Sequence, residues 1–207
     1  MNKDKKKIFD VIRCGTVAGV LMFSCMLYSS RANATETYQI DRAHSSLGFA
    51  VKHLTVGTVN GEFTDYFGTI QFDKADPAVF AAEVNIKTAS IDTRQKQRDD
   101  HLRGADFFDA EKFPVVSFKS KKLTAQGNTY LLTGDLMMHG VTKEISIPLT
   151  ISGPVKSPMG GEVIGLSAET TINRQDFGVS WNKALDSGGY VVGDEVKISV
   201  NIEAHKK

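Results

Sequence analysis

The stretch 98–103, with the sequence RDDHLR, contains the residue types that acid–base chemistry requires. A histidine beside a carboxylate could act as a general acid and base. Arg98 and His101 could instead hold the polar head group of a ligand, on one face of a short helix. A third interpretation is a solvated helix whose charges pair with one another, because such surface pairs are common and weak. We assign no catalytic residue and predict Arg98 and His101 as head-group contacts.

Other chemistry has little support in the spacing of the residues. No two of the five histidines have an H-x-H or H-x₃-H spacing; they are His44, His53, His101, His139 and His205. No G-x-S-x-G, Walker-type or dinucleotide-binding glycine motif is present. We therefore predict no metal site and no cofactor.

The first 34 residues are typical of a cleavable secretory signal peptide. A lysine-rich start precedes the mostly apolar run Cys14–Tyr28, and Ala32–Ala34 forms an A-x-A cleavage motif. The apolar run is shorter than the ~20 residues of a spanning helix, which argues against a membrane anchor. The sequence before Cys25 is a poor lipoprotein motif. We expect cleavage after Ala34, a periplasmic location, and a protein that does not span the membrane.

The remaining part, residues 35–207, is predicted to form one domain of 173 residues (207 minus 34). It contains neither cysteine, so its core must stabilise it without a disulfide. Six basic and two acidic residues give the signal peptide a charge of +4, and the whole chain is +1, which leaves about −3. Nucleic acid is therefore not an expected partner.

The dominant hydrophobic period of this domain is two, which predicts β-strands with one apolar face. Regular alternation covers five segments: 46–52, 80–87, 144–151, 166–173 and 196–203. Four less regular candidates are 58–64, 67–73, 115–122 and 129–138. Short turns join most of them, so we predict an all-β antiparallel sheet that closes into a barrel or stacks into a sandwich.

The long interruption in this pattern, near residues 93–113, predicts one short helical segment with Asp92 or Thr93 as its N-cap. Four of the domain's ten phenylalanines follow in or just after it: Phe107, Phe108, Phe113 and Phe118. An aromatic segment between strands is well placed to cover the mouth of a barrel.

A small barrel can be filled by side chains or can enclose one ligand. If it holds a ligand, the energies favour a lipid. Burial of ten methylenes contributes about 8 kcal/mol, of which association takes back at least ~4 kcal/mol. A charged hydrogen bond to a head group adds only about 1.5–3 kcal/mol. Apolar contacts would therefore set the affinity, and polar residues the orientation.

Ordered motifs across residues 37–204 resemble the YceI-like family of lipid- and polyisoprenoid-binding proteins. The motifs are YQID with AHS at 38–45, FAVKH at 49–53, GEF at 61–63, RDDHL at 98–102, DFFD at 106–109, FP at 113–114, GDL at 134–136, HGVTK at 139–143 and NRQDFG at 173–178. The resemblance implies an extended, lipocalin-like barrel of eight antiparallel strands, an apolar channel for an isoprenoid, homodimers, and no established catalytic activity. Met137-Met138 departs from the smaller or β-branched pair that is usual in the family, which bears on the identity of the ligand more than on the binding mode.

From residues and resemblance together we predict a periplasmic carrier or storage protein for a long-chain amphiphile of the polyisoprenoid or isoprenoid quinone type. The predicted wall consists of Phe49, Val51, Phe63, Phe72, Phe107, Phe108, Phe113, Phe118, Leu136, Met138 and Phe177. The predicted head-group contacts are Arg98, His101, His139 and Arg174. The alternatives are an enzyme acting on a prenyl or quinone-like compound through His101 and Asp100, and a ligand-free stress-protective module.

Overall fold

The computed structural model describes residues 35–186 and 188–207, so the predicted signal peptide lies outside the described residues. The strands are β1 (Glu36–His53), β2 (Gly57–Phe63), β3 (Tyr66–Phe72), β4 (Ala81–Lys87), β5 (Ile91–Asp92), β6 (Val115–Gln126), β7 (Thr129–Met138), β8 (Val141–Lys156), β9 (Glu162–Asn173) and β10 (Val192–Lys206). The helices are α1 (Lys96–Arg103) and the 3₁₀ turns η1 (Pro77–Val79), η2 (Thr88–Ser90) and η3 (Arg174–Phe177). No helix among the described residues is both long enough and apolar enough to cross a membrane.

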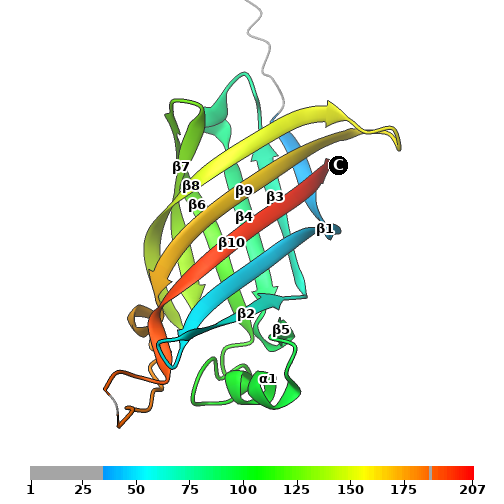
Figure 1. The fold of residues 1–207 in the computed structure, drawn as a ribbon. Coiled ribbons are helices and arrows are strands. Elements are labelled where there is room, and N and C mark those ends of the chain that lie inside the picture. The colour runs from blue at the N-terminus through cyan, green and yellow to red at the C-terminus, as the bar shows by residue number, and fades with distance from the viewer. Residues whose placement is uncertain (1–34, 187) are drawn as a thin grey trace, which may run out of the picture. The chain divides into compact units, whose positions relative to one another are not determined.

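Eight strands form a closed antiparallel barrel, which confirms the predicted fold class (Figure 1). Their order is β1-β3-β4-β6-β7-β8-β9-β10, and β10 returns to pair with β1. The two further strands, β2 and β5, extend from the second half of β1. Most sequence neighbours pair through short turns, as the alternating segments predicted.

Strand β1 changes its inward-facing phase halfway along its length. It pairs with β10 from Tyr38 to Asp41 and again from Ser46, and an irregular segment lies between the two stretches. Tyr38 and Ile40 face inward before this bulge and Leu47 faces inward after it, so the inward positions switch from even to odd numbers. The bulge therefore keeps an apolar face on the barrel interior along an 18-residue strand.

The C-terminus lies toward one end of the barrel (Figure 1). Large side chains of the main hydrophobic core fill this end. Tyr38 and Ile164 are 1% exposed, Ala204 is fully buried, and the rings of Phe72 and Phe80 meet edge to face. The barrel interior is therefore closed by packed core at this end.

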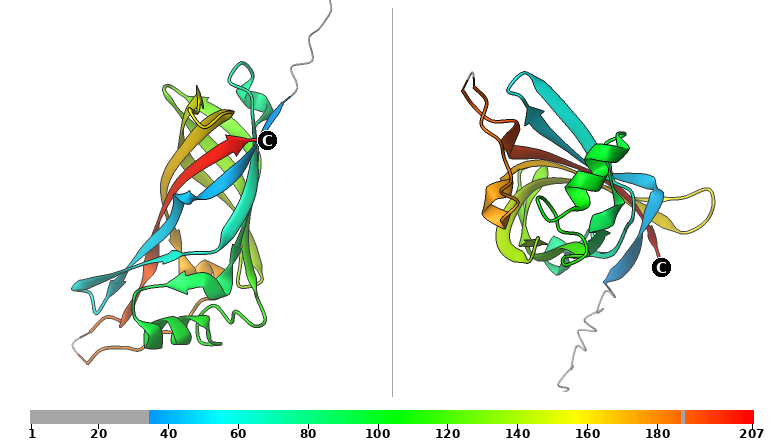
Figure 2. Two further views of the ribbon diagram at one scale, coloured as in Figure 1. Left: turned by 90° about the vertical axis from the view of Figure 1, so that its right-hand side faces the viewer. Right: turned by 90° about the horizontal axis from the view of Figure 1, so that it is seen from below.

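Helix α1 lies across the opposite end (Figure 2). Its N-cap is Gln95, whose side chain accepts from the Arg98 N–H, so the predicted cap at Asp92 or Thr93 is wrong. Thr93 takes part differently, since its N–H and hydroxyl donate to the buried Asp99 carboxylate at 2.8 and 2.5 Å. Arg103 donates to the carbonyls of residues 89 and 91, both at 2.7 Å. These bonds fix the helix to the strand segment that precedes it.

Candidate functional site

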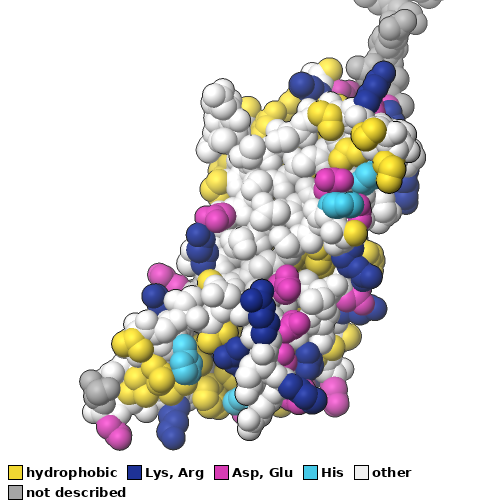
Figure 3. Space-filling view, turned by 45° about the vertical axis from the view of Figure 1, so that its right-hand side comes forward, with side chains coloured by type: hydrophobic (Ala, Val, Ile, Leu, Met, Phe, Trp, Pro, Cys, Tyr) yellow, Lys and Arg dark blue, Asp and Glu magenta, His cyan; other side chains and the backbone are white. Residues whose placement is uncertain are grey.

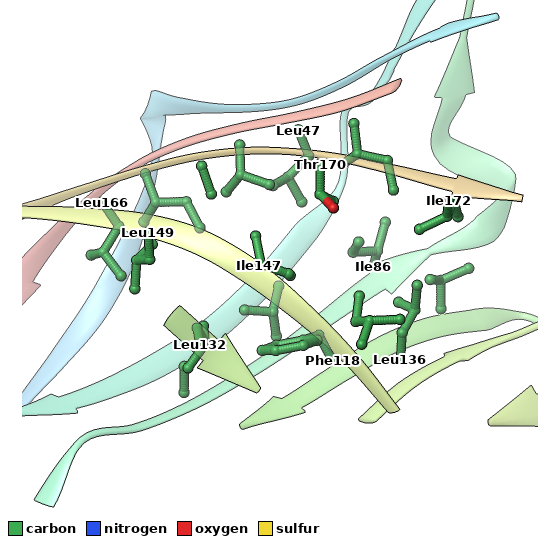
Figure 4. Close-up of a pocket in the computed structure, with 18 of the residues that line it drawn as sticks. Leu47, Ile86, Phe118, Leu132, Leu136, Ile147, Leu149, Leu166, Thr170 and Ile172 are labelled. Atoms are coloured by element: carbon green, nitrogen blue, oxygen red, sulfur yellow. The ribbon is translucent and has the colours of Figure 1, made fainter. Parts of the chain in front are cut away.

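An apolar cavity of about 170 Å³ lies inside the barrel (Figure 4). Among the described residues that line it, Thr170 alone carries a polar side chain. The others are aliphatic or aromatic, apart from a glycine: Leu47, Gly48, Phe49, Phe63, Ile70, Ala82, Val84, Ile86, Val116, Phe118, Leu132, Leu136, Met138, Ile145, Ile147, Leu149, Leu166, Ala168, Ile172, Ile198, Val200 and Ile202. Such a wall makes favourable apolar contacts with a hydrocarbon and provides almost no hydrogen-bond partners for a polar solute.

The size of this inner cavity bounds what it can hold. An apolar cavity of roughly 150 Å³ in another protein holds one benzene molecule, which has six carbons. By that measure, an inner cavity of 170 Å³ accepts about six carbons of a chain. A longer chain must extend through the open end or displace wall side chains.

A second cavity, of about 490 Å³, lies at the end covered by α1, and we call it the mouth cavity. It is bounded by β1, β2, α1 and the loop that precedes β10. Its lining residues are Phe49, Val51, Lys52, His53, Val59, Gln95, Gln97, Arg98, His101, Leu102, Phe107, Trp181, Val191 and Val192. Phe49 lines both cavities, so a molecule that passes this ring occupies an apolar chamber on one side and a mixed, partly cationic chamber on the other.

Two aromatic groups frame the mouth. The Phe63 ring lies 6.0 Å from Phe49 and 5.9 Å from Phe108. The Trp181 ring lies 5.3 Å from His101 and 5.2 Å from Phe107. Phe49 fits against its neighbour strand because Gly61 stands opposite it, where a side chain would overlap the ring.

Some hydrogen bonds of the charged side chains at the mouth are made within the protein. Arg98 donates through Nε and Nη2 to the hydroxyl and carbonyl of Thr93, at 2.7 and 2.8 Å. His101 Nε2 lies 2.8 Å from Asp106 Oδ2, and both side chains are about half exposed. Asp100 points elsewhere, to Lys96 and Arg103. The proposed His101–Asp100 acid–base pair is therefore wrong, and the carboxylate partner of His101 is Asp106.

The structure divides the predicted site residues into three groups. Five line the inner cavity: Phe49, Phe63, Phe118, Leu136 and Met138. The mouth cavity adds Val51, Arg98, His101 and Phe107. Neither lining includes Phe72, Phe108, Phe113, His139, Arg174 or Phe177.

Arg174 serves the fold. Its guanidinium is buried and donates to four main-chain carbonyls, those of Val179, Trp181, Val192 and Gly193. Burial lowers the pKa of Arg174, and the carboxylate of Asp194 at 2.9 Å opposes that shift. Its nitrogen donors hold the loop around Trp181 in place and face no cavity, so we remove it from the head-group candidates.

The remaining residues of the third group are packing residues. Phe177 is 2% exposed beside Leu136 and Met138, and its carbonyl meets His139 Nδ1 at 3.3 Å. The Phe113 ring lies 4.7 Å from the His139 ring. Phe113, His139 and Phe177 therefore contact one another and line neither cavity.

Sequence reasoning missed the aliphatic part of the wall and part of the mouth. Ile147, Leu149 and Val200 line the inner cavity, and they lie on the apolar phases of strands that the sequence analysis had identified. The predicted wall consisted mainly of aromatic residues, although the alternating aliphatic positions face the same interior. Trp181, the single tryptophan of the chain, lies in a segment without a periodic signal, so composition alone could have singled it out.

Comparison with known proteins places the barrel in a family. The YceI-like domain matches residues 38–204. A UPF0312 protein of Staphylococcus aureus strain N315 is 35% identical over 167 residues, which cover 80% of this chain and 95% of that protein. A UPF0312 protein of Pseudomonas putida strain F1 is 37% identical over 167 residues, covering 79% and 86%.

Solved structures agree with this assignment. BcnA of Burkholderia cenocepacia has a TM-score of 0.69 and 28% identity, covering 79% of this chain and 98% of that one. A YCEI protein of Campylobacter jejuni has a TM-score of 0.65 and 35% identity, covering 75% and 90%. A polyisoprenoid binding domain from Saccharophagus degradans shares the fold, with a TM-score of 0.61, 16% identity, and coverage of 84% and 100%. With the domain pattern spanning nearly all of the barrel, the chain belongs to the YceI-like domain family.

Proposed function

We propose that this protein binds a single-chain amphiphile, with the tail in the inner cavity and the head group in the mouth cavity. One observation supports this most strongly: a chamber lined by apolar side chains shares Phe49 with a chamber that contains Lys52, His53, Arg98 and His101. At about 0.8 kcal/mol per buried methylene, the tail would supply most of the affinity. Lys52 and Arg98, which carry positive charge, would orient an anionic or hydrogen-bond-accepting head group.

A prenyl tail, as in a polyisoprenol or an isoprenoid quinone, is the ligand class we propose. Its methyl branches suit a wall of aliphatic and aromatic side chains, and Met138 can adapt to an irregular chain. The Saccharophagus degradans domain with this fold is described as polyisoprenoid binding. At 16% identity that likeness shows the fold alone, so the prenyl assignment must be tested on this protein.

The ligand test starts from protein purified from its own cells. Native mass spectrometry should show an added mass, and solvent extraction should release a prenyl lipid. The delipidated protein should then bind prenyl alcohols in titration calorimetry. Absence of an extractable lipid, together with no uptake of any prenyl alcohol by the delipidated protein, would refute the proposal.

A matched pair of phenylalanine variants locates the site. Phe49→Ala removes the ring that both cavities share, whereas Phe67→Ala removes a ring that is 56% exposed on the outer surface. Loss of contact with about two methylenes predicts roughly 15-fold weaker binding for the first variant. The second should bind as the unchanged protein does. Equal affinities in the two variants would place the ligand elsewhere.

An enzymatic role has one specific observation in its favour, the His101–Asp106 pair at the mouth. This pair could act as an acid and base on a head group in the mouth cavity. His101→Ala should abolish turnover of a bound lipid while the lipid still binds. If the unchanged protein leaves every bound lipid chemically intact, the carrier function stands alone.

We also propose that the protein is exported and acts in the periplasm, as a carrier or store, and that it forms homodimers. Export predicts a mature protein whose measured mass begins after Ala34 and which appears in the periplasmic fraction. Light scattering on the purified protein tests the dimer. A cytoplasmic protein of full length, or a monomer at all concentrations, would remove the respective proposal.

A further inference from the structure

Two carboxylates stand directly opposite each other on the outside of the barrel. The register of β1 with β10 pairs Asp41 with Glu203, and Gln39 with His205 two residues along. Inward-facing Ile40 and Ala204, which pair with each other, are buried between them, so Asp41, Glu203 and His205 share the outer face. Like charges directly across a pair of strands destabilise it, and a bound cation would reverse the sign of that interaction.

The bulge of β1 brings a fourth side chain to this place. After Asp41 the chain leaves the regular ladder, and His44 folds back so that its Nδ1 lies 2.7 Å from Asp41 Oδ2. Ser45 secures the fold-back: its hydroxyl donates to the Asp41 carbonyl at 2.6 Å and accepts from the Glu203 N–H at 3.0 Å. The Ala43 N–H donates to Asp41 Oδ1 at 2.9 Å, which leaves Oδ2 facing the histidines. The position of His44 is thus fixed by the backbone as well as by charge.

The four side chains present their ligand atoms in a ring. Asp41 Oδ2 lies 2.7 Å from His44 Nδ1 and 3.5 Å from His205 Nε2. Glu203 Oε1 lies 4.0 Å from His44 Nδ1 and 3.0 Å from His205 Nε2. The ligand atoms of Asp41, His44 and Glu203 all lie within 4.8 Å of one another, and His205 stands beside this group through its contacts with the two carboxylates. Tetrahedral coordination at about 2.0–2.1 Å separates neighbouring ligand atoms by about 3.3–3.4 Å, which lies within the 2.7–4.0 Å span of the four distances above.

From this arrangement we propose that Asp41, His44, Glu203 and His205 form a site for a divalent transition-metal ion such as Zn²⁺. Two imidazole nitrogens with two carboxylate oxygens suit zinc, copper or nickel and discriminate against Mg²⁺ and Ca²⁺. Two carboxylates also balance the charge of a divalent ion when the histidines are neutral. All four side chains are partly exposed, between 28% and 66%, so the ion reaches them from solvent.

This site is separate from the lipid cavities. Histidine and acidic side chains gather on the outer face of the barrel (Figure 3), whereas both cavities are lined by other residues. The metal would link β1 to β10, the pair of strands that closes the barrel. The histidine spacing gave no hint of it, because His44 and His205 come from opposite ends of the domain.

Zinc binding by metal-stripped, tag-free protein tests the proposal. Titration calorimetry should show one Zn²⁺ per chain, and zinc should raise the thermal unfolding midpoint. His44→Ala and His205→Ala should each weaken binding at least about ten-fold, and the double variant should abolish it. Glu169→Gln is the matched control, because Glu169 is also an outer-face carboxylate, paired with Lys197 at 2.9 Å. It should bind zinc as the unchanged protein does.

Cobalt reports whether the four groups act together. Co²⁺ bound by four nitrogen and oxygen ligands absorbs visible light far more strongly than the hydrated ion, and this spectrum should vanish in the double variant. Circular dichroism confirms that each variant is folded, and His44→Asn with His205→Asn serves if the alanine pair is not. Absence of stoichiometric zinc binding, or zinc binding that survives unchanged in the folded double variant, would overturn the proposal. A calorimetric affinity for Mg²⁺ equal to that for Zn²⁺ would do the same.

Discussion

Adjacent alanines on β4 allow a test of the depth of the channel. Ala82 lines the inner cavity near its filled end, whereas Ala81 is exposed on the outer face. Replacement of Ala82 by phenylalanine places six ring carbons into a chamber that accepts about six carbons. The new ring should therefore fill the chamber and exclude the part of a tail that occupies it in the unchanged protein.

The expected loss of affinity depends on chain length. A tail that reaches the deep end would leave about six methylenes outside, which at about 0.8 kcal/mol each amounts to about 5 kcal/mol. That corresponds to an affinity lower by a few thousand-fold. Shorter chains, which do not reach Ala82, should bind both proteins equally. Ala81→Phe adds the same ring to the opposite face of the strand and should leave the whole length series unchanged.

Titration calorimetry with prenyl alcohols of increasing length measures this directly. Overpacking destabilises a core by about 1–3 kcal/mol, so the Ala82→Phe protein must first be shown to unfold cooperatively. If the folded variant keeps the length dependence of the unchanged protein, the tail does not occupy this chamber. A shift of the same size in Ala81→Phe would also refute the reasoning, since the effect would then not depend on the cavity.

Three further predictions concern the mouth and the parts that support it. Because Trp181 is the chain's single tryptophan and lines the mouth, a saturating prenyl lipid should shift the protein's fluorescence emission to shorter wavelength; unchanged emission would place the lipid away from the mouth. Asp99→Ala leaves the N–H and hydroxyl of Thr93 without their acceptor, and urea unfolding should show a loss of about 1–3 kcal/mol; a loss below the error of that measurement would contradict the assigned role. The hydrogen bond from Lys87 lowers the pKa of Asp65 below its ordinary 3.8. The contribution of Asp65 to stability is therefore present above that pH and is lost as the pH falls through the lower, folded-state pKa. Asp65→Asn should flatten the curve of unfolding free energy against pH in this acid range, and an unaltered curve would show that the pair does not contribute to stability.

The barrel could be predicted because its strands obey a simple period. Segments such as 144–151 and 196–203 alternate without exception, and β8 pairs with β9 across the short turn that joins them. The bulge of β1 could not be predicted in this way. It depends on hydrogen bonds between Ser45 and Glu203, which are far apart in the sequence, and no local pattern encodes that pairing.

The site was harder to predict than the fold because similar residue types have opposite roles. Arg98 and Arg174 each precede aromatic residues in the sequence, yet Arg98 lines the mouth and Arg174 is surrounded by carbonyl groups. The partners of Arg174 lie at the start of β10 and in the loop before it, and the path of that loop depends on the folded barrel. Burial and partner identity are properties of the assembled chain, and periodicity describes only which face a residue occupies.

Departures from regular strand pairing in β1 create the mouth cavity and also bring together the residues of the proposed metal site. Strand β1 pairs with β3 only from Glu36 to Gln39 and gives its second half to β2, from Leu47 to His53. If β1 had continued along β3, the barrel would lack the β2–β5 extension that, together with α1, bounds the mouth. The bulge that separates the two halves of β1 also turns His44 back toward Asp41. The bulge in β1 therefore affects two sites, the apolar chamber inside the barrel and the proposed metal-binding cluster on its outer face. Its removal would alter both.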